Sequence, residues 1–183
     1  MTRSPGDDDY VEAIALRNGA PATIRVMRPD DRGRLESAFA HLGQKSIYTR
    51  FFGLRNELPE RALDRIAEID FVHLAGLVVT VSSSAGEVII GSSTYVGVEE
   101  GSHAAEVAFT IAEDYQGQGL GGRLLAALAS IARRHGVARF IAEVLAGNAA
   151  MLKVFQRSGL PMTTHREDGG VIHVELDLAQ FPG

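Results

Sequence analysis

The fold is decided by one stretch, Glu106-Val-Ala-Phe-Thr-Ile-Ala-Glu-Asp-Tyr-Gln-Gly-Gln-Gly-Leu-Gly-Gly-Arg123. Its first six residues alternate between large apolar and other side chains, which is the two-residue period of a strand. A glycine-rich turn follows, and an apolar helical pattern begins near Leu120. Glycines let the backbone approach a ligand closely, and the first N–H groups of a helix attract anions. The stretch therefore predicts a phosphate-binding turn between a strand and a helix.

The composition is that of an ordinary globular protein and excludes several kinds of function. The chain has 183 residues, of which 45% are hydrophobic and 22% charged, and its net charge is −5. Its Lys and Arg residues are scattered, which argues against nucleic acid as the main partner. It has no cysteine, so that disulfides, thiolate nucleophiles and Cys-ligated metals are excluded. Its histidines show no metal-ligand spacing, and we expect no metal site.

The N-terminus and the apolar runs indicate a cytoplasmic protein. Residues 1–9 lack the apolar core of a secretory signal. The longest apolar runs, such as Leu74 to Val81, are too short for a membrane span, so we expect no membrane partner. We predict a flexible N-terminus over residues 1–20 and a single domain over residues 21–183.

Strand and helix patterns alternate along this domain. The predicted strands cover residues 23–27, 73–81, 87–98, 106–112, 140–145, 162–166 and 171–178. The predicted helices begin at Pro29, Ser46, Pro59, Leu120 and Ala149. A crossover through the helix at Leu120 makes the strands on either side of it parallel, whereas short turns make the preceding three strands antiparallel. The pattern predicts a mixed α/β fold, with a central sheet of about seven strands and helices on both faces.

Two spacings of the glycine-rich turn point to different ligands. Gly117-x-Gly119-x-x-Gly122 matches the dinucleotide fingerprint, with Glu143 about 20 residues beyond as the ribose-binding carboxylate. Against this interpretation, the polar residues 113–116 separate the strand from the first glycine, and the upstream strands are antiparallel. The other spacing is Gln116-x-x-Gly119-x-Gly121.

This second spacing resembles the acyl-CoA pyrophosphate loop of the GNAT N-acyltransferases. The order of elements also resembles that fold over nearly the whole chain, and Asn148 stands where many members carry an Asn after the fifth strand. The resemblance implies the GNAT fold and acetyl-CoA as acyl donor. It also implies that the fourth and fifth strands separate, so that the pantetheine arm pairs with the fourth.

The residues expected to bind acyl-CoA follow from the turn and from this resemblance. Backbone N–H groups of the turn would hold the pyrophosphate, and Arg123 would add a charged contact. Asn148 would either contact CoA or cap the following helix. The expected acyl-CoA-binding residues are Phe109, Thr110, Ile111, Gln116, Gly117, Gln118, Gly119, Leu120, Gly121, Gly122, Arg123 and Asn148.

Acyl transfer to an amine needs a base. An amine like that of lysine has a pKa near 10.4, so that deprotonating it at neutral pH costs about 4–5 kcal/mol. The stretch 105–119 resembles that of the bacterial protein-lysine acetyltransferases, in which the Glu matching Glu106 is the proposed general base acting through a water. Glu106 is therefore the expected catalytic residue, and the alternative is a solvated strand residue. The expected acceptor is an amine, with a protein lysine as the first candidate.

One departure from the family keeps other functions open. Many members carry a Tyr that protonates the departing thiolate, and the matching position here is Phe155. A thiol with a pKa near 8.5 can leave as its anion, and Tyr115 is an alternative acid. The helix at Ser46, with Tyr48, Arg50 and Phe51, would form the acceptor wall. The alternatives are a small-molecule amine acetyltransferase and a non-catalytic, regulatory acyl-CoA-binding module. We expect the protein to be a monomer or a homodimer.

Overall fold

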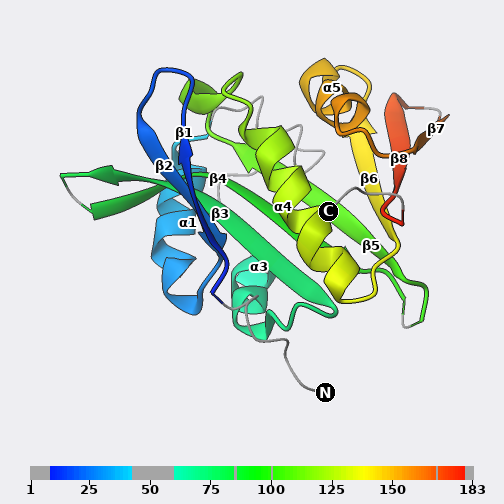
Figure 1. Ribbon diagram of the computed structural model, residues 1–183, viewed down its shortest axis with the longest axis horizontal. Coiled ribbons are helices and arrows are strands. Elements are labelled where there is room, and N and C mark those ends of the chain that lie inside the picture. The colour runs from blue at the N-terminus through cyan, green and yellow to red at the C-terminus, as the bar shows by residue number, and fades with distance from the viewer. Residues whose placement is uncertain (1–8, 43–59, 85, 100, 168, 180–183) are drawn as a thin grey trace.

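The described part of the chain forms one eight-stranded mixed sheet with helices on both faces (Figure 1). The computed structural model describes residues 9–42, 60–84, 86–99, 101–167 and 169–179. The strand order is β1-β2-β3-β4-β5-β6-β8-β7, in which β5 and β6 are parallel and all other neighbours antiparallel. The predicted mixed fold is confirmed, with one strand more than expected.

Most elements lie within a few residues of their predicted positions. The strands are β1 (Val11–Ala15), β2 (Pro21–Val26), β3 (Leu74–Ser83), β4 (Gly86–Gly97), β5 (Ala104–Ile111), β6 (Arg139–Leu145), β7 (Met162–Arg166) and β8 (Val171–Asp177). The α-helices are α1 (Arg32–Ala40), α3 (Glu60–Asp64), α4 (Leu120–Arg134) and α5 (Ala149–Arg157). The 3-10 helices are η1 (Pro29–Asp31), η2 (Arg65–Glu68) and η3 (Glu113–Tyr115). The helix predicted at Ser46 lies outside the described residues, as do Tyr48, Arg50 and Phe51.

The strand β1 was missed by the sequence analysis, which had assigned residues 1–20 to a flexible N-terminus. Val11–Ala15 pairs antiparallel with β2 across the whole of its length. It is an edge strand that buries Ile14 alone, so its apolar alternation is too short to detect. The detectable signal was the turn: Asn18-Gly19 is a strong hairpin sequence, and Gly19 has a φ of +83°. The Asn18 side chain accepts a hydrogen bond from the Ala20 N–H at 3.0 Å.

The core lies on both sides of β3, because helices cover the two faces of this strand. Residues 74–80 of β3 are all buried, which is the pattern of a strand without a solvent face. The apolar stripe of α4 packs on one face, where Leu124, Leu128 and Ile131 are fully buried. On the opposite face α1 and α3 pack, as Figure 1 shows. In the described residues no helix is long and apolar enough to cross a membrane.

A buried ion cluster attaches α1 to the sheet. The Arg25 guanidinium on β2 donates two hydrogen bonds of 2.7 Å to the Asp31 carboxylate, which stands at the junction of η1 and α1. Glu87 on β4 binds the same guanidinium at 2.6 Å. Arg25 and Asp31 are 5% and 0% exposed, so both charges depend on this pairing. The cluster fixes the start of α1 on the face opposite α4.

Candidate functional site

The strands β5 and β6 separate in the middle of the sheet. They form three parallel pairs, which end at Glu106 and Ile141. Beyond Glu106, β5 continues to pair with β4 as far as Ile111, while β6 pairs with β8 as far as Leu145. The edge of β5 over residues 107–111 that faces β6 therefore has no strand partner in this fully described part of the sheet. The separation that the sequence resemblance implied is confirmed.

A large cleft of about 1210 Å³ begins at this separation. It is lined by the end of β5, the turn before α4, the first turns of α4, and α5. The sequence-predicted residues that line it are Phe109, Thr110, Ile111, Gln116, Gly117, Gly119, Leu120, Gly121, Gly122, Arg123 and Asn148. Gln118 does not line the cleft: its Oε1 accepts a hydrogen bond from the Arg17 N–H at 2.9 Å. The structure thus brings together the predicted set except for Gln118.

The N-terminus of α4 opens into the large cleft without a side-chain cap. Its N-cap is Gly119, which has no capping side chain and adopts a left-handed φ of +83°. Gly117 also has a positive φ, of +73°. A Cβ on Gly121 would lie 3.2 Å from Val154 Cγ2, so this glycine lets α4 and α5 approach each other. The uncapped N–H groups and the helix dipole make this turn a fitting cradle for a phosphate.

The charge of the large cleft is opposite to that of the whole chain. Four cationic side chains line it, together with one acidic side chain, Glu113. The cations are Arg17, Arg123, Lys153 and Arg157. The chain as a whole carries a net charge of −5, so this cleft concentrates positive charge where an anionic ligand would enter.

Of these four cations, the sequence predicts only Arg123 as a contact of the donor. Lys153 and Arg157 are four residues apart on α5, a spacing that places them on one helix face and could have signalled their common role. Arg17 belongs to the turn between β1 and β2, within residues 1–20, for which the sequence predicts a flexible N-terminus.

Asn148 caps α5. Its Oδ1 accepts a hydrogen bond from the Met151 N–H at 3.2 Å. Of the two predicted roles, a CoA contact or a helix cap, the structure therefore shows the cap. This cap uses the carbonyl oxygen and leaves the side-chain NH2 group to donate elsewhere. Because Asn148 also lines the large cleft, its contact with a ligand stays a prediction.

A small cavity of about 70 Å³ adjoins the large cleft between β5, β6 and α5. Phe109, Asn148 and Met151 line both spaces. Glu106 also lines the small cavity, and so does Phe155, which is 1% exposed. The Phe155 ring meets the Phe109 ring edge-on at a centroid distance of 6.0 Å. An aromatic ring without a hydroxyl thus lines the same small cavity as the predicted base, whereas Tyr115 lines the large cleft.

Glu106 is exposed at the point where the strands separate. Alternation along β5 places it on the same sheet face as Ala108 and Thr110, which is the face that α1 partly covers. Glu143, on β6, also lines the small cavity, and the Nδ1 atom of His173 on β8 lies 3.7 Å from its Oε1. Two carboxylates therefore flank the opening on the face opposite α4.

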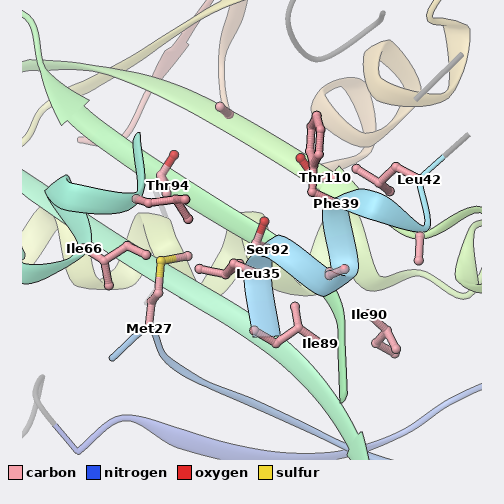
Figure 2. Close-up of a pocket in the computed structure, with 15 residues that line it drawn as sticks. Met27, Leu35, Phe39, Leu42, Ile66, Ile89, Ile90, Ser92, Thr94 and Thr110 are labelled. Carbon is pink, nitrogen blue, oxygen red and sulfur yellow. The ribbon is translucent and has the colours of Figure 1, made fainter. Parts of the chain in front are cut away.

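An apolar cavity of about 120 Å³ lies on this same face, between α1, η2 and the strands β4 and β5 (Figure 2). Leu35, Phe39 and Ile66 form part of its apolar wall, and the hydroxyls of Ser92 and Thr94 come from β4. Thr110 lines both this cavity and the large cleft. None of its described lining residues is charged. The two spaces are therefore neighbours across β5.

Comparison with known proteins agrees with this arrangement. The family model described as an acetyltransferase (GNAT) domain matches residues 22–161. The chain belongs to the GNAT acetyltransferase family. This membership confirms the sequence resemblance, and the alternative of a dinucleotide-binding fold is wrong. In a dinucleotide-binding fold the first glycine would follow the strand directly and begin a run of parallel strands, whereas this GNAT chain places η3 before Gly117 and has one parallel pair in its described sheet.

Named relatives of this GNAT chain are acetyltransferases. Acetyltransferase Pat of Mycolicibacterium smegmatis is 34% identical over 166 residues, which cover 90% of this chain and 48% of the relative. The chain thus spans about half the length of that relative. Acetyltransferase PA5475 of Pseudomonas aeruginosa is 34% identical over 145 residues, 79% of this chain and 76% of the relative. The crystal structure of the GNAT domain of S. lividans PAT superposes with a TM-score of 0.81 at 32% identity, covering 95% of this chain and 99% of that one.

Proposed function

We propose that this GNAT protein transfers the acetyl group of acetyl-CoA to an amine, with a protein lysine as the first candidate acceptor. The observation that carries the proposal is the separation of β5 from β6 directly after Glu106. It joins an open strand edge, a cationic cleft with an uncapped helix N-terminus, and a carboxylate within one continuous region. This combination suits a long anionic donor that reacts at its far end.

The donor fits the large cleft in two parts. Its pyrophosphate suits the turn before α4, where N–H groups and the helix dipole favour negative charge. Its pantetheine arm carries amide groups that can bond to the unpaired backbone edge of residues 107–111, as an added strand would. With the phosphates at the turn, this direction leads the thioester along β5 towards the small cavity and Glu106.

The proposed reaction needs one proton acceptor and one electrophile. The Glu106 carboxylate takes a proton from the acceptor ammonium through a water molecule. The neutral nitrogen then attacks the thioester carbonyl carbon, where the new C–N bond forms as the C–S bond breaks. A backbone N–H of β5 stabilises the oxygen that gains negative charge. The thiolate leaves as its anion without an acid from Phe155, which a leaving group with a pKa near 8.5 permits. The nitrogen releases its second proton to solvent water, which leaves the amide product.

The acceptor would approach from the sheet face opposite α4. Glu106 and Glu143 stand there at the small cavity, and opposite charges attract a protonated amine. The apolar cavity nearby suits an uncharged aliphatic segment beside that amine. A protein lysine has both parts, and the resemblance of residues 105–119 to the bacterial protein-lysine acetyltransferases supports this class of acceptor. A small-molecule amine is the alternative.

The first test concerns the donor. Calorimetry with acetyl-CoA, CoA and NAD should show binding of the two CoA compounds and none of NAD. Tight binding of NAD without binding of CoA would refute the proposal, because the phosphate cradle would then serve a dinucleotide.

The second test concerns turnover and the acceptor. Release of free thiol from acetyl-CoA should depend on an added acceptor, assayed with a panel of small amines and with lysine-containing proteins. Transfer to protein lysines, read by mass spectrometry, supports the proposed acceptor. Transfer to small amines alone favours the alternative acceptor class, and CoA binding without thiol release from any acceptor favours a non-catalytic acyl-CoA-binding module.

A further inference from the structure

The turn between β1 and β2 is attached to the turn that precedes α4. The Arg17 N–H donates a hydrogen bond of 2.9 Å to Gln118 Oε1, across 101 residues of sequence. Figure 1 shows this hairpin turn beside the segment that leads into α4. The bond uses the Arg17 backbone and the Gln118 side chain, so it places the Arg17 residue without engaging its guanidinium group.

A second contact joins the same hairpin to α4. Arg123 Nη1 lies 3.5 Å from Glu12 Oε1, and the Tyr10 hydroxyl donates a 2.8 Å hydrogen bond to Glu12 Oε2. Burial and this bond to Glu12 raise the pKa of Tyr10 to about 12. Glu12 is therefore held beside Arg123 and offsets part of its charge.

The Arg17 side chain differs from that of Arg123 in this respect. Both line the large cleft. Arg123 has Glu12 as an ion-pair partner, whereas no described acidic side chain pairs with Arg17. Arg17 is exposed and stands on the same side of the cleft as the turn before α4, whereas Lys153 and Arg157 come from α5. Its charge is thus available to an anion bound at that turn.

We propose that Arg17 binds the pyrophosphate of the acyl donor, which makes the β1–β2 turn part of the donor site. Gln118 holds this turn in place and does not itself contact the donor. The inference rests on the proposed function, since it assigns a further donor-binding residue to the same cleft. It changes the role expected for Gln118, and it adds a contact from residues 1–20.

The substitution Arg17→Ala tests the charge and keeps the backbone bond to Gln118. Its Kd for acetyl-CoA should rise about tenfold, as for the loss of one charged hydrogen bond. Acetyl-dephospho-CoA retains the pyrophosphate and should show the same rise by calorimetry. Acetyl-pantetheine has no phosphate, and its millimolar binding followed by NMR should not change. Arg166→Ala removes an exposed arginine of β7 outside the cleft and should alter none of the three affinities.

Three results would overturn the assignment. A loss with acetyl-CoA that disappears with acetyl-dephospho-CoA would place Arg17 at the 3′-phosphate. A loss of similar size with acetyl-pantetheine would show a general distortion of the cleft. Equal affinities of wild type and Arg17→Ala for acetyl-CoA would leave Arg17 without a role, whereas failure of the wild type to bind acetyl-CoA would refute the proposed function itself.

A double-mutant cycle tests the attachment through Gln118. Gln118→Ala removes the acceptor of the Arg17 N–H bond and should raise the Kd for acetyl-CoA severalfold in the wild-type background. In the Arg17→Ala background the same change should raise it much less, because residues that act as a unit are not additive. Additive losses would contradict the proposal that Gln118 acts by placing Arg17.

Discussion

The proposed base stands at the last position where β5 and β6 still pair. Register fixes this placement: Glu106 is opposite Ile141, and the strands separate one residue later. A carboxylate here is exposed, yet it lines the small cavity that adjoins the large cleft. The same backbone feature therefore opens the cleft and presents the proposed proton acceptor beside it.

Glu106→Gln should separate binding from chemistry. The amide cannot accept the proton, so turnover should fall about 10²–10³-fold, as for the loss of a general base. The Kd for acetyl-CoA should stay within about twofold, because Glu106 lies away from the turn before α4. Steady-state thiol release and calorimetry measure the two quantities.

The matched control is Glu175→Gln on β8, which removes a carboxylate paired with Arg139 at 3.0 Å and should leave turnover unchanged. Turnover of Glu106→Gln close to that of the wild type would show that Glu106 is not the base.

The sequence predicts the site residues that lie close together along the chain, but not those that come from distant segments. Glu106 and the glycines of the turn lie in one stretch of eighteen residues, whose spacing reports their proximity directly. Arg17 reaches the cleft through pairing with β2 and a bond to Gln118 far along the chain, and no local pattern records such a contact. The assignment of Asn148 as cap was open because a single residue can both cap a helix and contact a ligand.

Among the elements, α4 and α5 begin in opposite ways although both reach the cleft. Asn148 caps α5, so the Met151 N–H in its first turn has a side-chain partner. Gly119 leaves the start of α4 without one. The N-terminus of α4 can therefore bind an anion for two reasons: its glycines let a ligand approach, and no side chain caps its N–H groups. The helical period of residues 120–134 made this element predictable, whereas β1 buried too little to produce a period.

Alanine at two neighbouring glycines should have opposite effects on stability. Gly119 has a φ of +83°, and Ala in this region costs about 1 kcal/mol although its Cβ would meet no atom within 4 Å. Gly122 lies inside α4 with room for a Cβ, and Ala there should stabilise the helix by about 0.5–1 kcal/mol. Urea unfolding of the two variants measures both changes. A shift in the same direction for both would contradict the assigned backbone conformation of Gly119.

At the scale of the whole molecule, the sheet consists of two parts joined at β5 and β6. Strands β1 to β5 form one part with their helices, and β6, β8 and β7 form the other. Three parallel pairs connect them, and the proposed site occupies the gap beyond those pairs. The width of this gap between β5 and β6 stays constant only if each part of the sheet is rigid. In the first part, the ion cluster of Arg25, Asp31 and Glu87 attaches the start of α1 to the sheet.

Asp31→Asn should destabilise the whole domain. The Arg25 guanidinium donates hydrogen bonds to Asp31 first and then to Glu87, and these bonds outweigh burial and hold the pKa of Arg25 above its usual range. An arginine side chain stays charged without this rise, so the variant retains a buried cation. Asn keeps one acceptor oxygen but cannot neutralise this buried charge, and Glu87 offsets part of the loss. We expect a fall of about 2–4 kcal/mol in the free energy of unfolding.

The neighbouring carboxylate provides the control for this cluster. Asp30 has a side chain that is 72% exposed and lies 3.7 Å from Arg34, so Asp30→Asn should change stability by less than about 0.5 kcal/mol. Urea midpoints at pH 7 compare the two variants with the wild type, and an unchanged m-value shows that unfolding remains a single transition. If the two substitutions cost the same, the buried cluster does not hold α1 on the sheet. A large loss for Asp31→Asn alone would show that the charge pair that attaches α1, which forms one wall of the apolar cavity, stabilises the domain from outside the proposed site.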